Sequence, residues 1–206
     1  MNDRVLKRFV INLAILTFVM FTVWALIRSF SNRAPGDYDT TVCDNRLKDK
    51  LYDKAIKAAE TALDKMPSHR GAMMCKALVF ISQKDYEKAN LQLNQLIIFL
   101  ENNLEEDDPT GKGTLAAAYA NRGIIKDRKE DYNGALEDYL RALGIDPEAV
   151  GGPGFGTVIL NYKYKSSSVK ERALYLYEQL QLPENERVLK IKELDEGQVM
   201  HKPGKL

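Results

Sequence analysis

Few residues in this sequence have the types and spacing that catalysis or ligand binding requires. The stretch PTGKGT, residues 109–114, comes nearest to a phosphate-binding loop. Such a loop needs a glycine five positions before its Gly-Lys pair and a serine or threonine after it, because backbone N–H groups and a hydroxyl hold the phosphates and their metal ion. Glu106 and Gly113 occupy those two positions. We therefore reject a phosphate site.

The other titratable residues form no recognisable site. The acidic run at 105–108 lacks the alternating ligands and the glycine of a calcium loop, so we interpret it as a solvated segment. His69 and His201 have no obvious serine or cysteine partner in the sequence. The glycines at 151–156 follow no strand and are interpreted as a connection between helices. We predict that the protein is not an enzyme and uses no cofactor and no metal ion.

The near-zero net charge of the chain argues against a nucleic-acid partner. Lys and Arg number 30 against 29 Asp and Glu, which leaves a formal net charge of +1 over 206 residues. No overall field would hold the chain on nucleic-acid phosphates, so we expect no nucleic-acid partner. The length fits one domain with a sizeable core and short appendages.

An apolar segment near the N-terminus predicts a membrane anchor. Residues 9–27 are 19 consecutive uncharged residues. As a helix they would span about 28 Å, close to the thickness of a bilayer's hydrocarbon core. A cleaved signal peptide is the alternative, but its apolar region is usually shorter, and no Ala-x-Ala cleavage site follows. We predict a single transmembrane helix at 9–27, in contact with the lipid bilayer.

Flanking charges predict how this helix is oriented. Three basic residues precede it and two follow it: Arg4, Lys7, Arg8, Arg28 and Arg33. The excess before the helix favours a cytoplasmic N-terminus at 1–8. In a bacterial inner membrane, a linker at 28–41 and the rest of the chain would then lie in the periplasm.

A tyrosine and alanine frame recurs after the anchor. LYDKA, DYEKA and DYNGA contain Tyr52, Tyr86 and Tyr132, which lie 34 and then 46 residues apart. The second interval equals the first plus a 12-residue insertion at 104–115, which we interpret as a surface loop because it contains a proline and two glycines. Proline follows the frame at Pro67 and Pro147, where a helix has to end.

This pattern resembles the tetratricopeptide repeat (TPR), a 34-residue unit of two antiparallel helices. The best match is the unit 116–149, which has the family's aromatic, small and proline residues at seven positions: Tyr119, Gly123, Tyr132, Ala135, Tyr139, Ala142 and Pro147. The units 36–69 and 70–103 match at fewer positions, and 150–183 is a degenerate fourth unit.

The resemblance implies an all-α fold. The N-terminal single transmembrane helix would be followed by a TPR-like α-solenoid of three to four helix pairs over 42–195. An amphipathic helix at 184–195 would cap the stack, since a terminal repeat needs a polar outer face. Residues 196–206 would form a tail.

The same resemblance implies that the two cysteines lie near each other. Cys43 and Cys75 would lie on the first helices of adjacent units, which pack side by side in TPR domains. In an oxidising periplasm they could form a disulfide. Two buried thiols are the alternative.

The resemblance also implies a binding surface, because TPR domains bind peptides in a concave groove lined by first helices. The frame places eight residues along it: Leu47, Lys48, Met74, Leu78, Ile81, Asn121, Ile124 and Arg128. Each could instead belong to the core between repeats. The basic clamp for acidic tails is largely missing, so a hydrophobic or amphipathic peptide is the expected ligand.

These features together predict a membrane-tethered scaffold or assembly factor that binds a partner protein through a TPR groove. The alternative is a constitutive structural or accessory subunit of a larger membrane protein complex, held by its transmembrane helix. In that case Asn12, Thr17 and Thr22 could make polar contacts with neighbouring helices.

Overall fold

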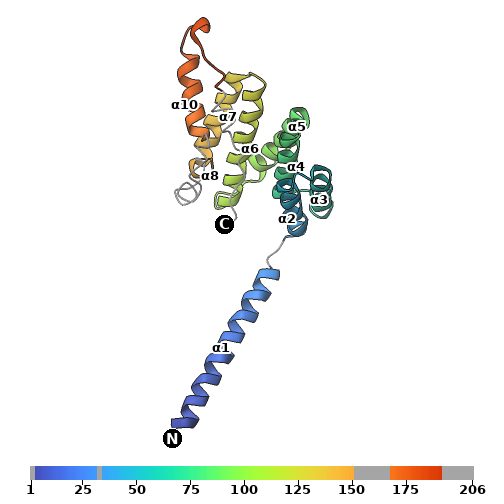
Figure 1. Cartoon of the computed structure of the whole chain (residues 1–206), viewed down its shortest axis with the longest axis vertical. Helices are drawn as coiled ribbons and strands as arrows, with labels where there is room; N and C mark the ends of the chain where they lie inside the picture. The colour runs from blue at the N-terminus through green and yellow to red at the C-terminus, as the bar shows by residue number, and fades with distance from the viewer. Residues whose placement is uncertain (1–2, 32–33, 151–167, 192–206) are drawn as a thin grey trace.

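The computed structural model describes residues 3–31, 34–150 and 168–191, and every regular element in these ranges is a helix. α1 (Asp3–Ser31) stands apart from an array of shorter helices (Figure 1). The array consists of α2 (Asp37–Lys48), α3 (Tyr52–Lys65), α4 (Arg70–Ser82), α5 (Tyr86–Asn103), α6 (Pro109–Arg128), α7 (Tyr132–Ile145), α8 (Pro147–Val150), α10 (Val169–Leu180) and the 3-10 turn η1 (Glu184–Glu186). The predicted all-α class is confirmed for this part of the chain.

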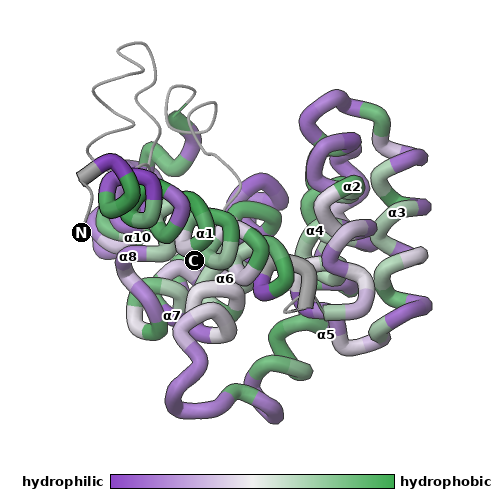
Figure 2. Tube along the Cα trace, turned by 90° about the horizontal axis from the view of Figure 1, so that it is seen from below, coloured by the Kyte–Doolittle hydropathy of each residue, from purple (hydrophilic) through white to green (hydrophobic). Residues whose placement is uncertain are grey.

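Six of these helices form three consecutive pairs. Tyr52, Tyr86 and Tyr132 are the first residues of α3, α5 and α7, so the recurring tyrosine marks the same place in each pair. A short turn reverses the chain before each tyrosine, and the two helices of a pair pack against each other. Figure 2 shows α2, α3 and α4 at one end of the array and α7, α8 and α10 at the other.

The three turns share one backbone conformation. Lys50, Lys84 and Glu130, each two residues before its tyrosine, have φ angles of 58°, 61° and 67°. The Lys84 N–H donates to the Ile81 carbonyl at 3.0 Å, and the next N–H donates to the Phe80 carbonyl at 2.9 Å. The other two turns repeat both bonds. This is the Schellman arrangement, which satisfies the last carbonyls of the first helix.

Small residues let the paired helices approach closely. Ala55, Ala59 and Ala62 are the fully buried residues of α3. Gly123 in α6 faces Tyr139 in α7, and a Cβ added to this glycine would lie 2.7 Å from the tyrosine ring. A side chain at position 123 would therefore push α6 and α7 apart.

Residues 109–115 are helical, so the prediction of a surface loop over 104–115 is wrong beyond residue 108. The Asp108 side chain accepts a hydrogen bond from the Gly111 N–H at 2.7 Å, and Pro109 is the first residue of α6. An aspartate cap followed by proline is a helix start signal, and here it outweighs the two glycines.

The predicted linker at 28–41 is helical at both ends. α1 continues to Ser31, and α2 begins at Asp37, five residues before the predicted start of the repeat domain. α2 is the first helix of the unit 36–69, and its apolar pattern is weak because Cys43 is its only buried residue. Gly36 precedes α2 with a φ of 94°, a conformation that favours glycine.

The predicted capping helix at 184–195 is wrong over the residues that the structure describes. Only Glu184–Glu186 are helical, as a single 3-10 turn, and the chain from Arg187 is extended. Side chains of α10 bind this extended backbone: the Val188 N–H donates to Gln179 Oε1 at 2.7 Å, and Arg172 donates to the Leu189 carbonyl at 3.0 Å. Residues 192–195, the predicted tail at 196–206 and most of the first helix of the fourth unit, 151–167, lie outside the described residues.

The left-handed turn predicts a stabilising substitution. Lys84→Gly should raise the free energy of unfolding by about 0.5–1 kcal/mol, because glycine removes the cost of a positive φ but adds some unfolded-state entropy. Lys84→Val, which puts a β-branched residue at the same φ, should lower it. Urea denaturation followed by circular dichroism measures both, and a less stable glycine variant would contradict the interpretation.

Candidate functional site

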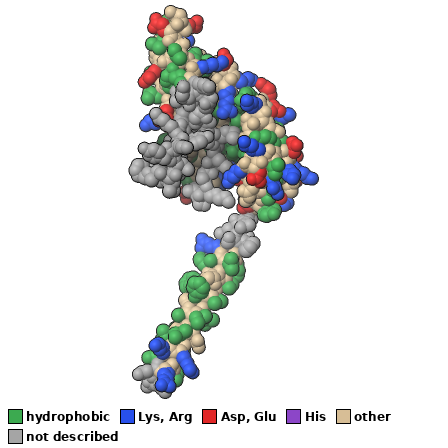
Figure 3. Space-filling view, viewed as in Figure 1, with side chains coloured by type: hydrophobic (Ala, Val, Ile, Leu, Met, Phe, Trp, Pro, Cys, Tyr) green, Lys and Arg blue, Asp and Glu red, His purple; other side chains and the backbone are tan. Residues whose placement is uncertain are grey.

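α1 presents its apolar side chains to the outside. The segment Arg4–Arg28 contains a long apolar stretch, and none of that stretch is buried against the rest of the described chain. Figure 3 shows hydrophobic side chains along α1, with basic side chains gathered at its N-terminal end. The helix is long and apolar enough to cross a membrane.

The two threonine hydroxyls of α1 are satisfied within the helix. The Thr17 hydroxyl donates to the Leu13 carbonyl at 2.8 Å, and the Thr22 hydroxyl donates to the Val19 carbonyl at 2.8 Å. Neither threonine therefore needs a hydroxyl partner on another helix. At the end of α1 that leads to α2, the Arg28 guanidinium lies 5.2 Å from the centre of the Trp24 ring. Such a pair suits the polar interface of a bilayer.

Most of the predicted groove residues are buried. Five of the eight are at most 3% exposed: Met74, Leu78, Ile81, Asn121 and Ile124. The Asn121 amide lies 3.6 Å from the Met74 sulfur, which places these first-helix side chains of α4 and α6 in direct contact. These five residues were interpreted either as the lining of a groove or as part of the core between repeats, and the structure places them in the core.

The other three groove residues lie at the ends of first helices. Leu47 is partly buried against the core. Lys48 and Arg128 are exposed, and they are the last residues of α2 and α6. A basic residue there interacts favourably with the negative end of the helix dipole.

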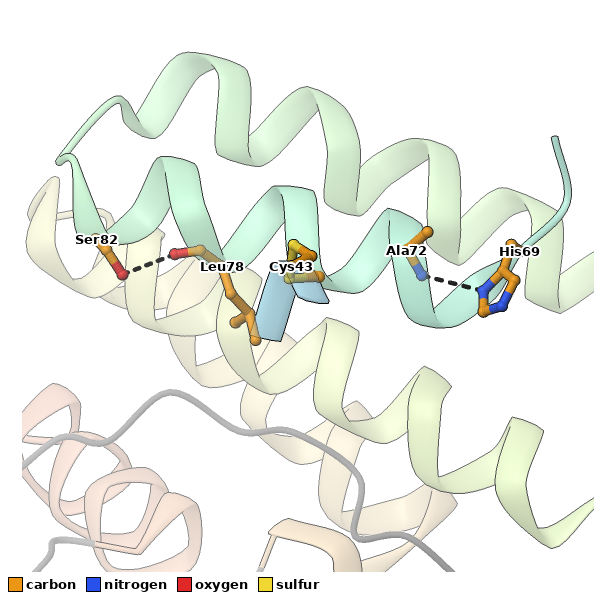
Figure 4. The surroundings of a disulfide bond; sticks show 6 residues. Cys43, His69, Ala72, Leu78 and Ser82 are labelled. Atoms are coloured by element: carbon orange, nitrogen blue, oxygen red, sulfur yellow. Dashed lines mark hydrogen bonds between the residues drawn. A yellow bond between two sulfur atoms is a disulfide. The ribbon is translucent and has the colours of Figure 1, made fainter. Parts of the chain in front are cut away.

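Cys43 and Cys75 form a disulfide that joins α2 to α4. Both cysteines are completely buried, and Ala55, Ala59 and Val79 complete the cluster around them. Figure 4 shows the bond beside the middle of α4, with His69 at the start of that helix. Of the two alternatives, the structure contains the disulfide.

His69 acts as a helix cap. Its Nδ1 accepts a hydrogen bond from the Ala72 N–H at 3.2 Å, so the ring proton lies on Nε2 and is donated to Asp37 Oδ1 at 3.0 Å. This assigns the tautomer from the hydrogen bonds. Both nitrogens are used for structure, which leaves none to act as a catalytic base.

The residues rejected as ligand sites also have structural partners. Lys112 donates to the Glu106 carbonyl at 2.7 Å. Asp108 accepts from Arg70, whose hydrogen bond holds the pKa of this carboxyl below its ordinary value. Among the described residues, no group of three or more His, Cys, Asp or Glu could hold a metal ion.

A buried ion-pair network that the sequence analysis missed joins the second and third helix pairs. Arg122 of α6 donates to both oxygens of Asp138 in α7, at 2.8 and 2.7 Å, and to Asn94 of α5 at 2.7 Å. Lys126 also pairs with Asp138 at 2.9 Å. The hydrogen bonds to Asp138 raise the pKa of Arg122, so its charge is held firmly.

A second missed ion pair attaches α10. Arg172 donates to both oxygens of Asp127 in α6 at 2.7 Å, and the Tyr139 hydroxyl lies 3.2 Å from one of them. Arg172 and Asp127 are 1% and 5% exposed, so this pair is part of the core. One signal was available in the sequence, because an arginine stands between Val169 and Leu176 on the apolar face of α10.

No protein-family model matches this sequence, and no curated protein matches it. The class of protein is therefore defined by the structure alone. It is a helical, repeat-like protein with one N-terminal helix long and apolar enough to cross a membrane.

Removal of one partner of the buried Arg172–Asp127 pair should cause a large loss of stability. Arg172→Met should lower the free energy of unfolding by about 3–5 kcal/mol, because it leaves the Asp127 charge buried without its partner. Adding Asp127→Leu should recover most of that loss. Lys190→Ala, which removes an exposed ion pair with Glu130, should cost less than about 1 kcal/mol. Urea denaturation compares the variants, and equal losses for Arg172→Met and Lys190→Ala would contradict the prediction.

Proposed function

We propose that this protein is a membrane-tethered TPR scaffold that binds a partner protein or membrane protein complex. The observation that carries the proposal is that one helix pair recurs three times. Each pair has a left-handed residue at the same position of its turn and a tyrosine at the start of its second helix. Stacked pairs of this kind build the extended surfaces that repeat proteins use for binding. α1 supports the tether.

The proposed contact surface is the edge formed by the ends of the first helices. The apolar residues first assigned to a groove are buried, so they are not available to a ligand. Lys48 and Arg128 are exposed at equivalent ends of α2 and α6. They suit a partner segment that carries acidic side chains. Confinement beside a membrane raises the effective concentration of such a partner, so weak contacts are sufficient.

The proposed location is a bacterial inner membrane, with the N-terminus cytoplasmic and the repeat domain periplasmic. The buried Cys43–Cys75 disulfide supports an oxidising compartment for the domain. The basic excess at the N-terminal end of α1 supports the same orientation.

An exchange of the membrane span tests the scaffold against the subunit alternative. Residues 9–27 are replaced by an unrelated uncharged span of equal length, and co-purifying proteins are identified by mass spectrometry. A scaffold should retain its partner, because binding resides in the helical array. Loss of the partner would favour a subunit held by its span.

Reversal of two charges in the full-length protein tests the proposed contact surface in the same co-purification assay. Lys48→Glu with Arg128→Glu should reduce the recovered partner at least fivefold. The matched control is Lys54→Glu with Lys57→Glu, two exposed residues of the second helix α3, which should leave recovery unchanged. Equal loss in both variants would contradict a specific role for the first-helix ends.

The location predicts the behaviour of reporter fusions in a bacterial host. Alkaline phosphatase is active only after export, so a fusion after Leu206 should be active, whereas β-galactosidase at the same position should be inactive. Exchange of the basic residues between the two ends of α1 provides the control, and it should lower the phosphatase activity. The opposite pattern in the native chain would contradict the orientation.

A further inference from the structure

We infer that the Cys43–Cys75 disulfide is a clasp that keeps α2, the helix next to the membrane anchor, docked on the repeat array. With the clasp closed, α1 is joined covalently to α4 through α2. With it open, α2 undocks while the helices from α4 onward stay folded. This role concerns the tether and does not depend on which partner the array binds.

α2 has little else to hold it by apolar packing. Cys43 is its only buried residue, whereas α4 has eight buried residues. Leu47 is only partly buried, and Tyr38 is 69% exposed. A helix whose only buried side chain is a cysteine buries little apolar surface, so apolar burial contributes little free energy to its docking.

The disulfide lies in a second cluster of buried residues, which adjoins the main core through the partly buried Leu47 and Ile56. The bond packs among Ala55, Ala59 and Val79, a cluster distinct from the larger one that joins α4 to α10. Leu47, Tyr52 and Ile56 pack against this cluster but are only partly buried, so the disulfide is the contact of α2 that lies deepest between α3 and α4. Without the bond, the loss of this contact is confined to α2 and its immediate neighbours.

Two ion pairs anchor the first turn of α2. Asp37 pairs with His69, and Asp39 pairs with Lys65. Lys65 is the last residue of α3 and His69 is the N-cap of α4, so both ion pairs hold the first turn of α2 near the turn between α3 and α4. The Thr40 hydroxyl is buried and makes no hydrogen bond with a described residue, which weakens the docked position.

Because α2 follows α1 directly in the chain, the clasp determines how far the repeat array can lie from the end of α1. Ser31 ends α1 and Asp37 begins α2, so an extended chain between them spans at most about 20 Å. A docked α2 therefore holds the array close to the end of α1. An undocked α2 adds its own 12 residues to the tether and lets the array move further away.

A dithiol would open the clasp by two exchange steps. One thiolate attacks a cysteine sulfur, breaking the bond and releasing the other cysteine as a thiolate. The second thiol of the reagent then displaces the first cysteine, so two electrons pass to the protein and the reagent becomes a cyclic disulfide. Because both sulfurs are completely buried, the reagent reaches them only when α2 moves.

Hydrogen exchange on the full chain in detergent micelles tests the inference. In Cys43→Ala with Cys75→Ala, amides of α2 should exchange at least tenfold faster than in the native chain, and amides of α6 and α7 should stay within twofold. A native chain reduced by dithiothreitol, with both thiols confirmed by alkylation, should give the same pattern.

Val79→Ala is the matched control, because it removes apolar volume beside the disulfide and leaves the bond intact. Its α2 amides should stay within threefold of the native rate. Unchanged protection of α2 without the bond would overturn the inference, as would loss of protection in every helix together. Equally fast exchange of α2 in Val79→Ala would also overturn it, because packing rather than the bond would then hold the helix.

Discussion

The array depends on one backbone constraint, the sharp reversal between the two helices of each pair. Lys50, Lys84 and Glu130 adopt a left-handed conformation that most residues avoid, and each turn then closes the same two hydrogen bonds. With the carbonyls of the first helix satisfied, the second helix can begin at once and pack back along the first. Each following tyrosine is thereby placed at the start of a second helix, where it packs against the core.

Electrostatic contacts fix the helices within the third pair and attach α10 to that pair. Asp138 is 1% exposed yet is paired with Arg122 and Lys126, and Asp127 is paired with Arg172. A buried charge without its partner is costly, so these pairs favour one relative position of the helices over any slipped alternative. The apolar contacts are less selective, because the helix faces are rich in alanine and tolerate small shifts. Packing therefore supplies cohesion, and the ion pairs supply register.

The sequence predicted the pairs well because their signals are local. Tyrosine and alanine spacing, and prolines after α3 and α7, act within one unit and do not depend on distant residues. It failed where a long-range contact decides the structure. Arg187 and the residues after it were predicted as helix from their apolar spacing, but Gln179 and Arg172 hold them extended. The same limit explains the missed ion pair, since Arg172 and Asp127 lie 45 residues apart.

The side chains expected to line a groove were harder to predict than the helix pairs for a physical reason. A frame of 34 residues fixes which side of a helix faces its neighbours, but it does not say how closely the first helices approach. Here Met74 and Asn121 touch, so the side chains expected to line a groove meet each other instead. Exposure then remains at the helix ends, where Lys48 and Arg128 extend into solvent. If the proposed scaffold function holds, recognition through such ends would rely on charge, which acts over a Debye length, and a membrane tether would limit the distance over which that charge has to act.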